Sequence, residues 1–258
     1  MSIIKKIIGN TSFYEKMQAN KLAAFRKAEA IKEMQQLPIR KQFYQQFIQP
    51  KDLVFDVGAN VGNRVQVFLA ISAKVIAVEP QPACINTLEE KFGNDIVIEK
   101  VGLGKESGVL EMFIANDSTI STFSKEFIEN TSTHRFSNYA WNQTLEVPIV
   151  TLDSLIEKHG VPQFCKIDVE GFELNVLAGL THKIPYLSFE YCVPEMMQNM
   201  LDCLRRLNEI NPAGLFNYSI AEKMELALPK WISFEEMYEL VQQDNFTNTL
   251  FGDIYFKS

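Results

Sequence analysis

The feature that most constrains the fold is an alternation of short apolar strands with helices, which begins near Asp52 and continues to the end of the chain. The strands, such as "DLVFDV" and "KVIAV", are largely apolar rather than alternating between apolar and polar residues. Strands of this kind are buried on both faces, and their alternation with helices indicates a mostly parallel sheet covered on both sides. We therefore expect an α/β fold, with an antiparallel final strand and with ligands bound at the carboxyl ends of the strands.

Residues 1–50 differ from the rest of the chain, because they are rich in lysine, glutamine and alanine and carry apolar side chains at helical spacing. This pattern predicts one long helix from Ser12, broken near Pro38, and a second helix through Phe47. We expect an N-terminal helical appendage over residues 1–50 and a single α/β domain over residues 51–258. Such helices cover a face of the core or of a partner, so a homo-oligomer would form through them.

Charge and cysteine content narrow the functional class. The chain of 258 residues has a formal net charge of -7, which argues against a dedicated nucleic-acid-binding protein. Its opening, "MSIIKKIIGN", is too short and too rich in lysine for a signal peptide or a membrane span. The four cysteines are scattered without a C-x-x-C pair, so neither a zinc site nor a disulfide framework is expected. We expect a soluble, cytoplasmic protein with no membrane span and no nucleic-acid partner.

The ends of the first three strands have the composition of a nucleoside-binding site. In "VFDVGANVG", Gly58 and Gly62 permit a tight turn and a close approach of the backbone to a ligand. The second strand ends in "VIAVEPQP", where Glu79 can accept hydrogen bonds from both ribose hydroxyls of an adenosine and Pro80 ends the strand. After the third strand, Gly102 leaves room for an adenine ring, although a plain turn explains this glycine equally well.

Two cofactors use this arrangement, and the details of the turn distinguish them. A nicotinamide dinucleotide requires a second glycine where this chain has Asn60. The carboxylate of Asp56 would repel a diphosphate but attract the ammonium group of S-adenosylmethionine. The D-x-G-x-N-x-G pattern therefore favours S-adenosylmethionine. A nicotinamide cofactor, or a glycine turn with no ligand, remains as an alternative.

Acidic residues mark the ends of the next two strands. Asp168 and Glu170 follow the strand "QFCKIDV", and Glu190 lies in "YLSFEYC". Carboxylates that lie close together raise each other's pKa, so one of them could act as a base or all of them could hold a metal. We predict Asp168 as the catalytic base and Glu170 or Glu190 as the group that orients the acceptor, and we assign no metal ligand. The simpler interpretation of Glu170 is a helix cap, and Glu173 is interpreted as a surface charge.

The segment 115–147 is polar and irregular, as is typical of lids and binding segments. Within it, His134 and Trp141 are candidates for contact with the acceptor, the tryptophan by stacking on a sugar ring. The alternatives are a solvated histidine and a tryptophan that anchors the loop to the core.

The chain resembles the FkbM-type family of class I S-adenosylmethionine-dependent methyltransferases in four stretches: "LVFDVGANVGN", "VIAVEPQP", "VTLDSLIEKHGVPQFCKIDVEGFELNVLAGL" and "LSFEY". The resemblance implies a seven-stranded methyltransferase fold and O-methylation, often of sugar or polyketide hydroxyls. Asp168, Glu170 and Gly171 match the acidic signature of the family, and Ser121 and Thr122 lie near a serine-rich stretch that could touch cofactor or acceptor. The residues that would bind the cofactor are Asp56, Gly58, Asn60 and Gly62 at its methionine end and Glu79 at its ribose.

We therefore expect a methyltransferase that uses S-adenosylmethionine to methylate a hydroxyl of a sugar, a glycan or another small molecule. Two other hypotheses remain at this stage. One is an NAD-dependent enzyme with a Rossmann-like fold. The other is a non-catalytic, cofactor-binding scaffold that recruits a partner through its N-terminal helices.

Overall fold

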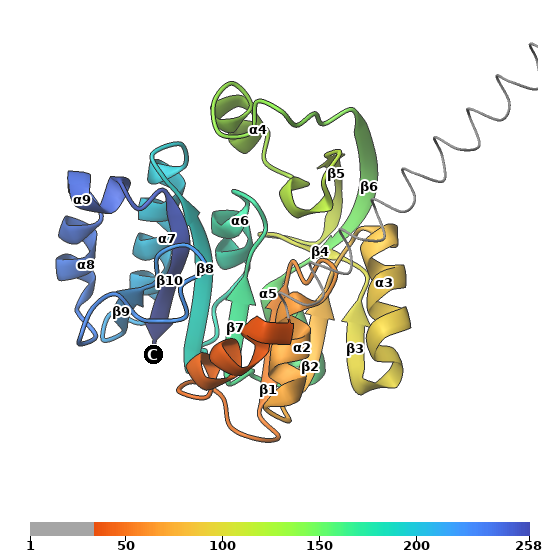
Figure 1. Ribbon diagram of the computed structural model, residues 1–258, viewed down its shortest axis with the longest axis horizontal. Coiled ribbons are helices and arrows are strands. Elements are labelled where there is room, and N and C mark those ends of the chain that lie inside the picture. Colours follow the sequence, from red (N-terminus) through yellow and green to blue (C-terminus); the bar gives the residue numbers. More distant parts are fainter. Residues whose placement is uncertain (1–33) are drawn as a thin grey trace, which may run out of the picture.

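The computed structural model describes residues 34–258, which form a seven-stranded sheet with helices on both faces (Figure 1). The strands are β1 (Leu53–Val57), β2 (Lys74–Val78), β3 (Ile96–Glu99), β7 (Phe164–Ile167), β8 (Tyr186–Cys192), β9 (Leu215–Tyr218) and β10 (Phe251–Lys257). They lie in the order β3-β2-β1-β7-β8-β10-β9. Of these seven strands, β10 alone runs antiparallel to the other six. The predicted α/β fold, with a mostly parallel sheet and an antiparallel final strand, is confirmed.

The strands are apolar along their length because both faces of the sheet are buried. Phe55 and Val57 of β1 belong to one core, and Val54 belongs to the other, as expected when successive side chains point to opposite faces. The first core also contains side chains from five helices, namely α5 (Leu152–His159), α6 (Glu173–Ala178), α7 (Met197–Ile210), α8 (Phe234–Leu240) and α9 (Asp244–Thr247). The second core contains side chains of α2 (Asn63–Ala70) and α3 (Pro82–Phe92).

The end of the predicted N-terminal appendage is part of this second core. Residues 34–44 are helical and continue through Pro38, so the predicted break at this proline is wrong for the described residues. A proline removes one intrahelical hydrogen bond without having to end the helix. The aromatic side chains of Phe43 and Tyr44 are buried, and the ring of Phe47 stacks on Phe164 of β7. The rest of the predicted appendage, residues 1–33, lies outside the described residues.

A second, three-stranded sheet stands beside the main one, with the order β4-β6-β5. Its strands are β4 (Gly102–Leu103), β5 (Gly108–Ile114) and β6 (Gln143–Val150). Between β5 and β6 the chain forms α4 (Lys125–Thr131) and a 3-10 turn at Ser118–Ile120, and another 3-10 turn, Gly93–Asp95, precedes β3. The segment 115–147 was predicted to be irregular throughout, whereas it contains α4 and the start of β6.

Figure 1 shows α4, β5 and β6 together on one side of the main sheet. Across residues 34–258, no helix combines the length and the apolar character needed to cross a membrane.

Candidate active site

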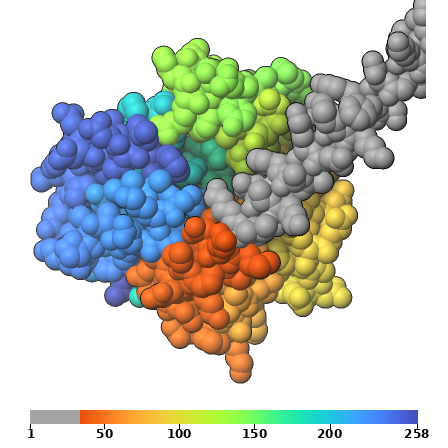
Figure 2. Space-filling view, in the orientation of Figure 1, coloured from red at the N-terminus to blue at the C-terminus, as the bar shows by residue number. Residues whose placement is uncertain are grey.

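A cavity of about 380 Å³ lies at the carboxyl ends of β1, β2, β7 and β8. Its volume falls in the range of roughly 300–1,000 Å³ that is usual for small-molecule sites. Figure 2 shows residues of the β7–α6 region (teal) recessed between the α4 segment (green) and the C-terminal segments (blue). Ligands of open α/β sheets bind at this edge, so the cavity is where the strand-end residues were expected to meet.

The turn after β1 forms one wall of the cavity and depends on left-handed backbone conformations. Gly58, Asn60 and Gly62 have φ angles of 82°, 47° and 84°. A Cβ atom at position 58 would lie 1.8 Å from the carbonyl oxygen of Asp168, so only glycine allows the turn to pack against the end of β7. Gly62 precedes the first residue of α2. The turn therefore brings its backbone to the cavity and joins the ends of β1 and β7.

Glu79 lies just after β2, is 2% exposed and lines the cavity. One of its carboxylate oxygens accepts a hydrogen bond from the backbone N–H of Asn60 at 2.8 Å, and the other accepts one from the N–H of Gln81 at 2.8 Å. Burial raises the pKa of Glu79, and these two hydrogen bonds oppose that effect. A carboxylate oxygen has a second lone pair, so the fixed side chain can still accept two hydroxyl donors from a ligand.

Asp56 is 2% exposed, and its Oδ2 atom has no hydrogen-bond partner among the described residues. Burial raises the pKa of this carboxyl to about 6. A buried carboxylate oxygen without a partner is costly, unless a ligand at the cavity wall supplies a donor. The ammonium group of S-adenosylmethionine is such a donor, so the residues present at this end of the cavity fit that cofactor.

The opposite end of the cavity is more apolar. Gly102, Met112 and Phe123 line it, and Pro80 lies beside Glu79. A Cβ atom on Gly102 would lie 2.8 Å from the ring of Phe123, so the absence of a side chain keeps this end open. Every residue predicted to bind the cofactor lines the cavity except Gly62, which closes the turn behind it.

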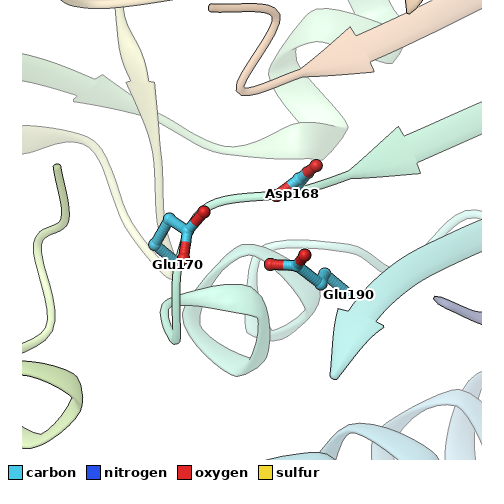
Figure 3. Close-up of side chains that lie close together, drawn as sticks. All are labelled: Asp168, Glu170 and Glu190. Carbon is cyan, nitrogen blue, oxygen red and sulfur yellow. The ribbon is translucent and has the colours of Figure 1, made fainter. Parts of the chain in front are cut away.

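The three predicted catalytic acids meet on another wall. Asp168, Glu170 and Glu190 each offer a carboxylate oxygen, and the three atoms lie within 4.8 Å of one another. Figure 3 shows the three side chains converging from the end of β7, from the turn that follows it and from β8. Carboxylate oxygens at this spacing are also ligands for a divalent cation. The assignment of no metal ligand therefore remains a prediction.

The pKa values of the three acids shift in different directions, because among residues 34–258 only Asp168 has a cationic hydrogen-bond partner. Lys166 is 2% exposed, and its ammonium group donates a hydrogen bond to Asp168. Burial alone would raise the pKa of Asp168, but Lys166 outweighs it and holds this pKa below its usual value. Burial, followed by the charge of Asp168, raises the pKa of Glu170 and of Glu190 well above the usual value. Of the three acids, Asp168 therefore ionises most readily, and Glu170 and Glu190 keep their protons to higher pH than an ordinary carboxyl does.

The turn that carries Glu170 is held from two sides. The φ angle of Glu170 is 53° and that of Gly171 is 82°. The backbone N–H groups of Val169 and Gly171 donate to Oε1 of Glu173 at 3.1 and 3.2 Å. The hydroxyl of Thr122 donates to the carbonyl oxygen of Glu170 at 2.7 Å.

Two interpretations of these acids change as a result. Glu173 is 3% exposed, so its interpretation as a surface charge is wrong; its place directly after a turn, at the start of α6, was the available sequence signal. Burial raises the pKa of Glu173 to about 7. Glu170 lines the cavity, and α6 has no side-chain cap, so the structure does not support the helix-cap alternative.

The residues predicted to contact the acceptor are separated in the structure. Ser121 lines the cavity, and its hydroxyl accepts a hydrogen bond from the N–H of Ala115. Thr122 is fully buried and supports the Glu170 turn instead. His134 and Trp141 do not line the cavity, and the indole N–H of Trp141 donates to the carbonyl oxygen of Ile120 at 2.9 Å. That bond anchors the loop, as the alternative interpretation of this tryptophan stated.

Sequence reasoning missed four charged residues that line the same cavity: Arg40, Arg64, Lys166 and Glu222. Lys166 was detectable, because a lysine inside an otherwise apolar buried strand requires a partner. The other three come from the N-terminal helix, from α2 and from the segment after β9, so only the folded chain brings them together.

Comparison with known proteins identifies methyltransferases, in agreement with the geometry of the cavity. A model of the methyltransferase FkbM domain matches residues 56–210. The hexuronic acid methyltransferase AglP of Haloferax volcanii is 28% identical over 143 residues, which are 54% of this chain and 54% of that protein. The chain thus spans about half the length of the curated relative it matches.

Similar solved structures include the precorrin-6y C5,15-methyltransferase of Geobacter metallireducens, with a TM-score of 0.45 and 7% identity over 85% of this chain and 88% of that chain. A TehB-like SAM-dependent methyltransferase of Corynebacterium glutamicum has a TM-score of 0.42 and 10% identity over 85% and 87% of the two chains. The FkbM domain model covers more than half of the sequence. The chain therefore belongs to the FkbM family of S-adenosylmethionine-dependent methyltransferases.

Proposed function

We propose that this methyltransferase transfers a methyl group from S-adenosylmethionine to a hydroxyl oxygen of a sugar, either free or within a glycan. The observation that carries the proposal is the ionised carboxylate of Asp168, which shares one cavity with the unpartnered carboxylate oxygen of Asp56. A cationic cofactor and a hydroxyl acceptor would each find a matching group there. The hexuronic acid methyltransferase among the relatives supports a sugar acceptor.

In the proposed complex, Asp56 binds the ammonium group of the cofactor and Glu79 accepts hydrogen bonds from the ribose hydroxyls. The backbone of Gly58, Asn60 and Gly62 follows the methionine portion. The apolar end of the cavity, near Gly102 and Pro80, holds the adenine. Hydrogen bonds to charged groups contribute about 1.5–3 kcal/mol each, so Asp56 is expected to provide a large share of the affinity.

When bound, the cofactor supplies an electrophilic methyl group. Asp168 accepts a hydrogen bond from the acceptor hydroxyl and takes its proton as the oxygen becomes methylated. Glu170 and Glu190, whose pKa values are raised, donate hydrogen bonds in their protonated form to other oxygens of the acceptor and fix its orientation. Lys166 keeps Asp168 ionised.

The same lysine makes Asp168 a weak base, so the barrier must be lowered mainly by other means. Holding two reactants in the correct geometry lowers a barrier by up to about 7–11 kcal/mol. A general base typically accelerates a reaction by about 10²–10⁴-fold. Positioning is therefore the larger contribution, and the proposal does not depend on a catalytic histidine.

Two measurements test the proposal. Isothermal titration with S-adenosylhomocysteine should show binding to the full chain. Mass spectrometry should then detect an O-methylated product in a panel of neutral and acidic sugars incubated with S-adenosylmethionine. Glu239→Gln, an exposed site on α8, serves as the control variant. Absence of binding, or methylation at carbon or nitrogen only, would contradict the proposed function.

Three expectations rest on the sequence alone and remain predictions: a cytoplasmic location, the absence of a nucleic-acid partner, and a homo-oligomer formed through the N-terminal helices.

A further inference from the structure

Two arginines lie close to each other in the wall of the cavity that also holds the acid cluster. Arg40 comes from the helix at residues 34–44 and is 7% exposed. Arg64 is the second residue of α2, and its side chain is 13% exposed. Both line the cavity together with Asp168 and Glu190. Two guanidinium groups are thus nearly buried within a site where an acceptor would have to bind.

One carboxylate bridges the two arginines. Glu222 accepts a hydrogen bond from Nη2 of Arg64 at 2.7 Å and a longer one from Nη2 of Arg40 at 3.5 Å. Its own side chain is 62% exposed. Ion pairs with an exposed partner contribute only about 0–1 kcal/mol, so Glu222 is a weak permanent partner for the nearly buried guanidinium of Arg64.

Glu222 belongs to an irregular segment, residues 219–230, between β9 and α8. The N–H of Ser219 donates to the carbonyl oxygen of Asp253, and the segment is thereby anchored to β10. Ala221 has a φ angle of 50°, in the left-handed region that disfavours residues other than glycine. Glu222 thus reaches α2 from the β9–β10 edge of the sheet, on the same side as Glu190 and away from the apolar end of the cavity.

Arg64 has a donor that Glu222 does not use. Nε of Arg64 is buried and has no hydrogen-bond partner among residues 34–258. A guanidinium offers five N–H donors in a planar fork that matches a carboxylate with two parallel hydrogen bonds. Glu222 engages Arg64 through Nη2 only. A carboxylate seated on both Nε and Nη2 of Arg64 would satisfy the buried donor.

We propose that Arg64 and Arg40 form a subsite for a carboxylate group of the acceptor, and that Glu222 occupies this subsite until the acceptor displaces it. The inference rests on the proposed function and narrows the acceptor to a carboxylate-bearing sugar. The carboxylate group of S-adenosylmethionine is the other carboxylate that could bind to these arginines. The acceptor is favoured because Glu222 belongs to the segment after β9, which lies on the far side of β8 from Glu79, the residue expected to hold the ribose of the cofactor.

The test compares two probes that differ only in charge, D-glucuronate and its neutral amide D-glucuronamide. Their affinities are measured by isothermal titration against the full chain, with and without saturating S-adenosylhomocysteine. We expect the wild type to bind D-glucuronate about tenfold more tightly than D-glucuronamide, as an added charge-assisted hydrogen bond would give. Glu222→Gln retains the shape of the side chain but removes the competing charge, so it should bind D-glucuronate several-fold more tightly than the wild type does.

Arg64→Gln should remove the preference for the acid and leave the affinity for S-adenosylhomocysteine unchanged. Arg205→Gln, on the exposed side of α7, is the matched control and should change neither affinity. A thermal melt establishes that Arg64→Gln is folded. Because the side chain of Glu222 is exposed, Glu222→Gln should fold normally, and its result does not depend on the Arg64→Gln variant.

Two results would overturn the inference. One is equal binding of the two probes by the wild type and by Glu222→Gln. The other is a loss of affinity for S-adenosylhomocysteine in Arg64→Gln with the preference for D-glucuronate intact, because the arginine would then bind the cofactor. Failure of the proposed function can be told apart from failure of this inference. In the first case the wild type does not bind S-adenosylhomocysteine or yields no methylated product.

Discussion

The ammonium group of Lys166 donates a hydrogen bond to the carboxylate of Asp168, two residues further along the chain and just beyond β7. Lys166 is 2% exposed, whereas the side chain of Asp168 is 33% exposed. Lys166 also pairs in register with Asp56 of β1. One buried cation therefore keeps a carboxylate ionised at the cavity wall and balances the acid at the cofactor end.

Replacing Lys166 by methionine tests this relationship. Without the ammonium group, burial acts unopposed and the pKa of Asp168 rises. The acidic limb of the pH profile of kcat should therefore move to higher pH. Removing one partner of a buried ion pair costs about 3–5 kcal/mol, and the partial exposure of Asp168 places the expected loss in unfolding free energy at the lower end. The double variant K166M/D168N should recover part of that loss; an unmoved acidic limb in K166M would mean that another group takes the proton.

Asp168→Asn should lower kcat by about 10²–10⁴-fold, the contribution typical of a general base. Its affinity for S-adenosylhomocysteine should stay at the wild-type value. Glu170→Gln and Glu190→Gln are matched controls, because an amide keeps the size and a hydrogen-bond donor but cannot take up a proton as a base, and they should lose less activity. A larger loss in Glu190→Gln than in Asp168→Asn would move the base to Glu190. Steady-state kinetics with saturating cofactor provide the comparison.

Cofactor affinity should depend on pH through Asp56, whose pKa is raised to about 6. The ionised carboxylate is the form that binds an ammonium group. Affinity for S-adenosylhomocysteine should therefore be nearly complete about one unit above pH 6, be halved near pH 6 and be about tenfold lower about one unit below it. Asp56→Asn should bind more weakly and without this dependence. Isothermal titration of the wild type and of Asp56→Asn across this pH range measures the effect. A wild-type affinity that does not change with pH would show that Asp56 does not bind the ammonium group.

Much of the fold was predictable because both faces of the sheet are buried. Continuous apolar strands such as β1 and β2 predicted parallel pairing, and the late strand β10 was expected to be antiparallel. The strand β6 was missed, because Pro148 and the polar residues before it do not have the pattern of a strand. In the structure, β6 is held by pairing with β5 on one side and β4 on the other, which a local pattern cannot reveal.

The candidate site was predictable where its residues follow strands and not where they come from elsewhere. Glu79, Asp168 and Glu190 lie at or near the ends of strands, so the order of the sheet brings them together. Arg64 and Glu222 are separated by 158 positions and belong to different layers, so no spacing rule connects them. The charge of a residue alone also gives a wrong prediction for Glu173. This glutamate is buried because it accepts hydrogen bonds from the turn before α6, and its charge does not reveal that turn.

Removal of divalent metal should leave activity unchanged. The ammonium group of Lys166 already balances the charge of Asp168, and the raised pKa values of Glu170 and Glu190 weaken them as ligands, because a metal binds the deprotonated form. Activity measured after dialysis against a chelator should therefore equal the activity measured with added magnesium. Activity lost on chelation and restored by magnesium would instead make these three carboxylates the ligands of a metal.

Glu173 should make stability depend on pH, because its folded pKa of about 7 lies above the ordinary value of 4.5. Between these values the native state holds a proton that the unfolded chain has released, so stability decreases as the pH rises through this window and levels off above pH 7. A difference of this size corresponds to about 3 kcal/mol at about 1.4 kcal/mol per unit.

Glu173→Gln should remove this dependence and be more stable than the wild type at pH 8. Its side-chain oxygen can still accept the N–H groups of Val169 and Gly171, so the turn that carries Glu170 and the activity should persist. Glu173→Ala leaves both N–H groups without a partner and should lower kcat together with stability. Chemical unfolding at several pH values, beside kinetics of both variants, separates the charge of this residue from its hydrogen bonds. Equal kcat values in the two variants would show that the hydrogen bonds to Glu173 do not position Glu170.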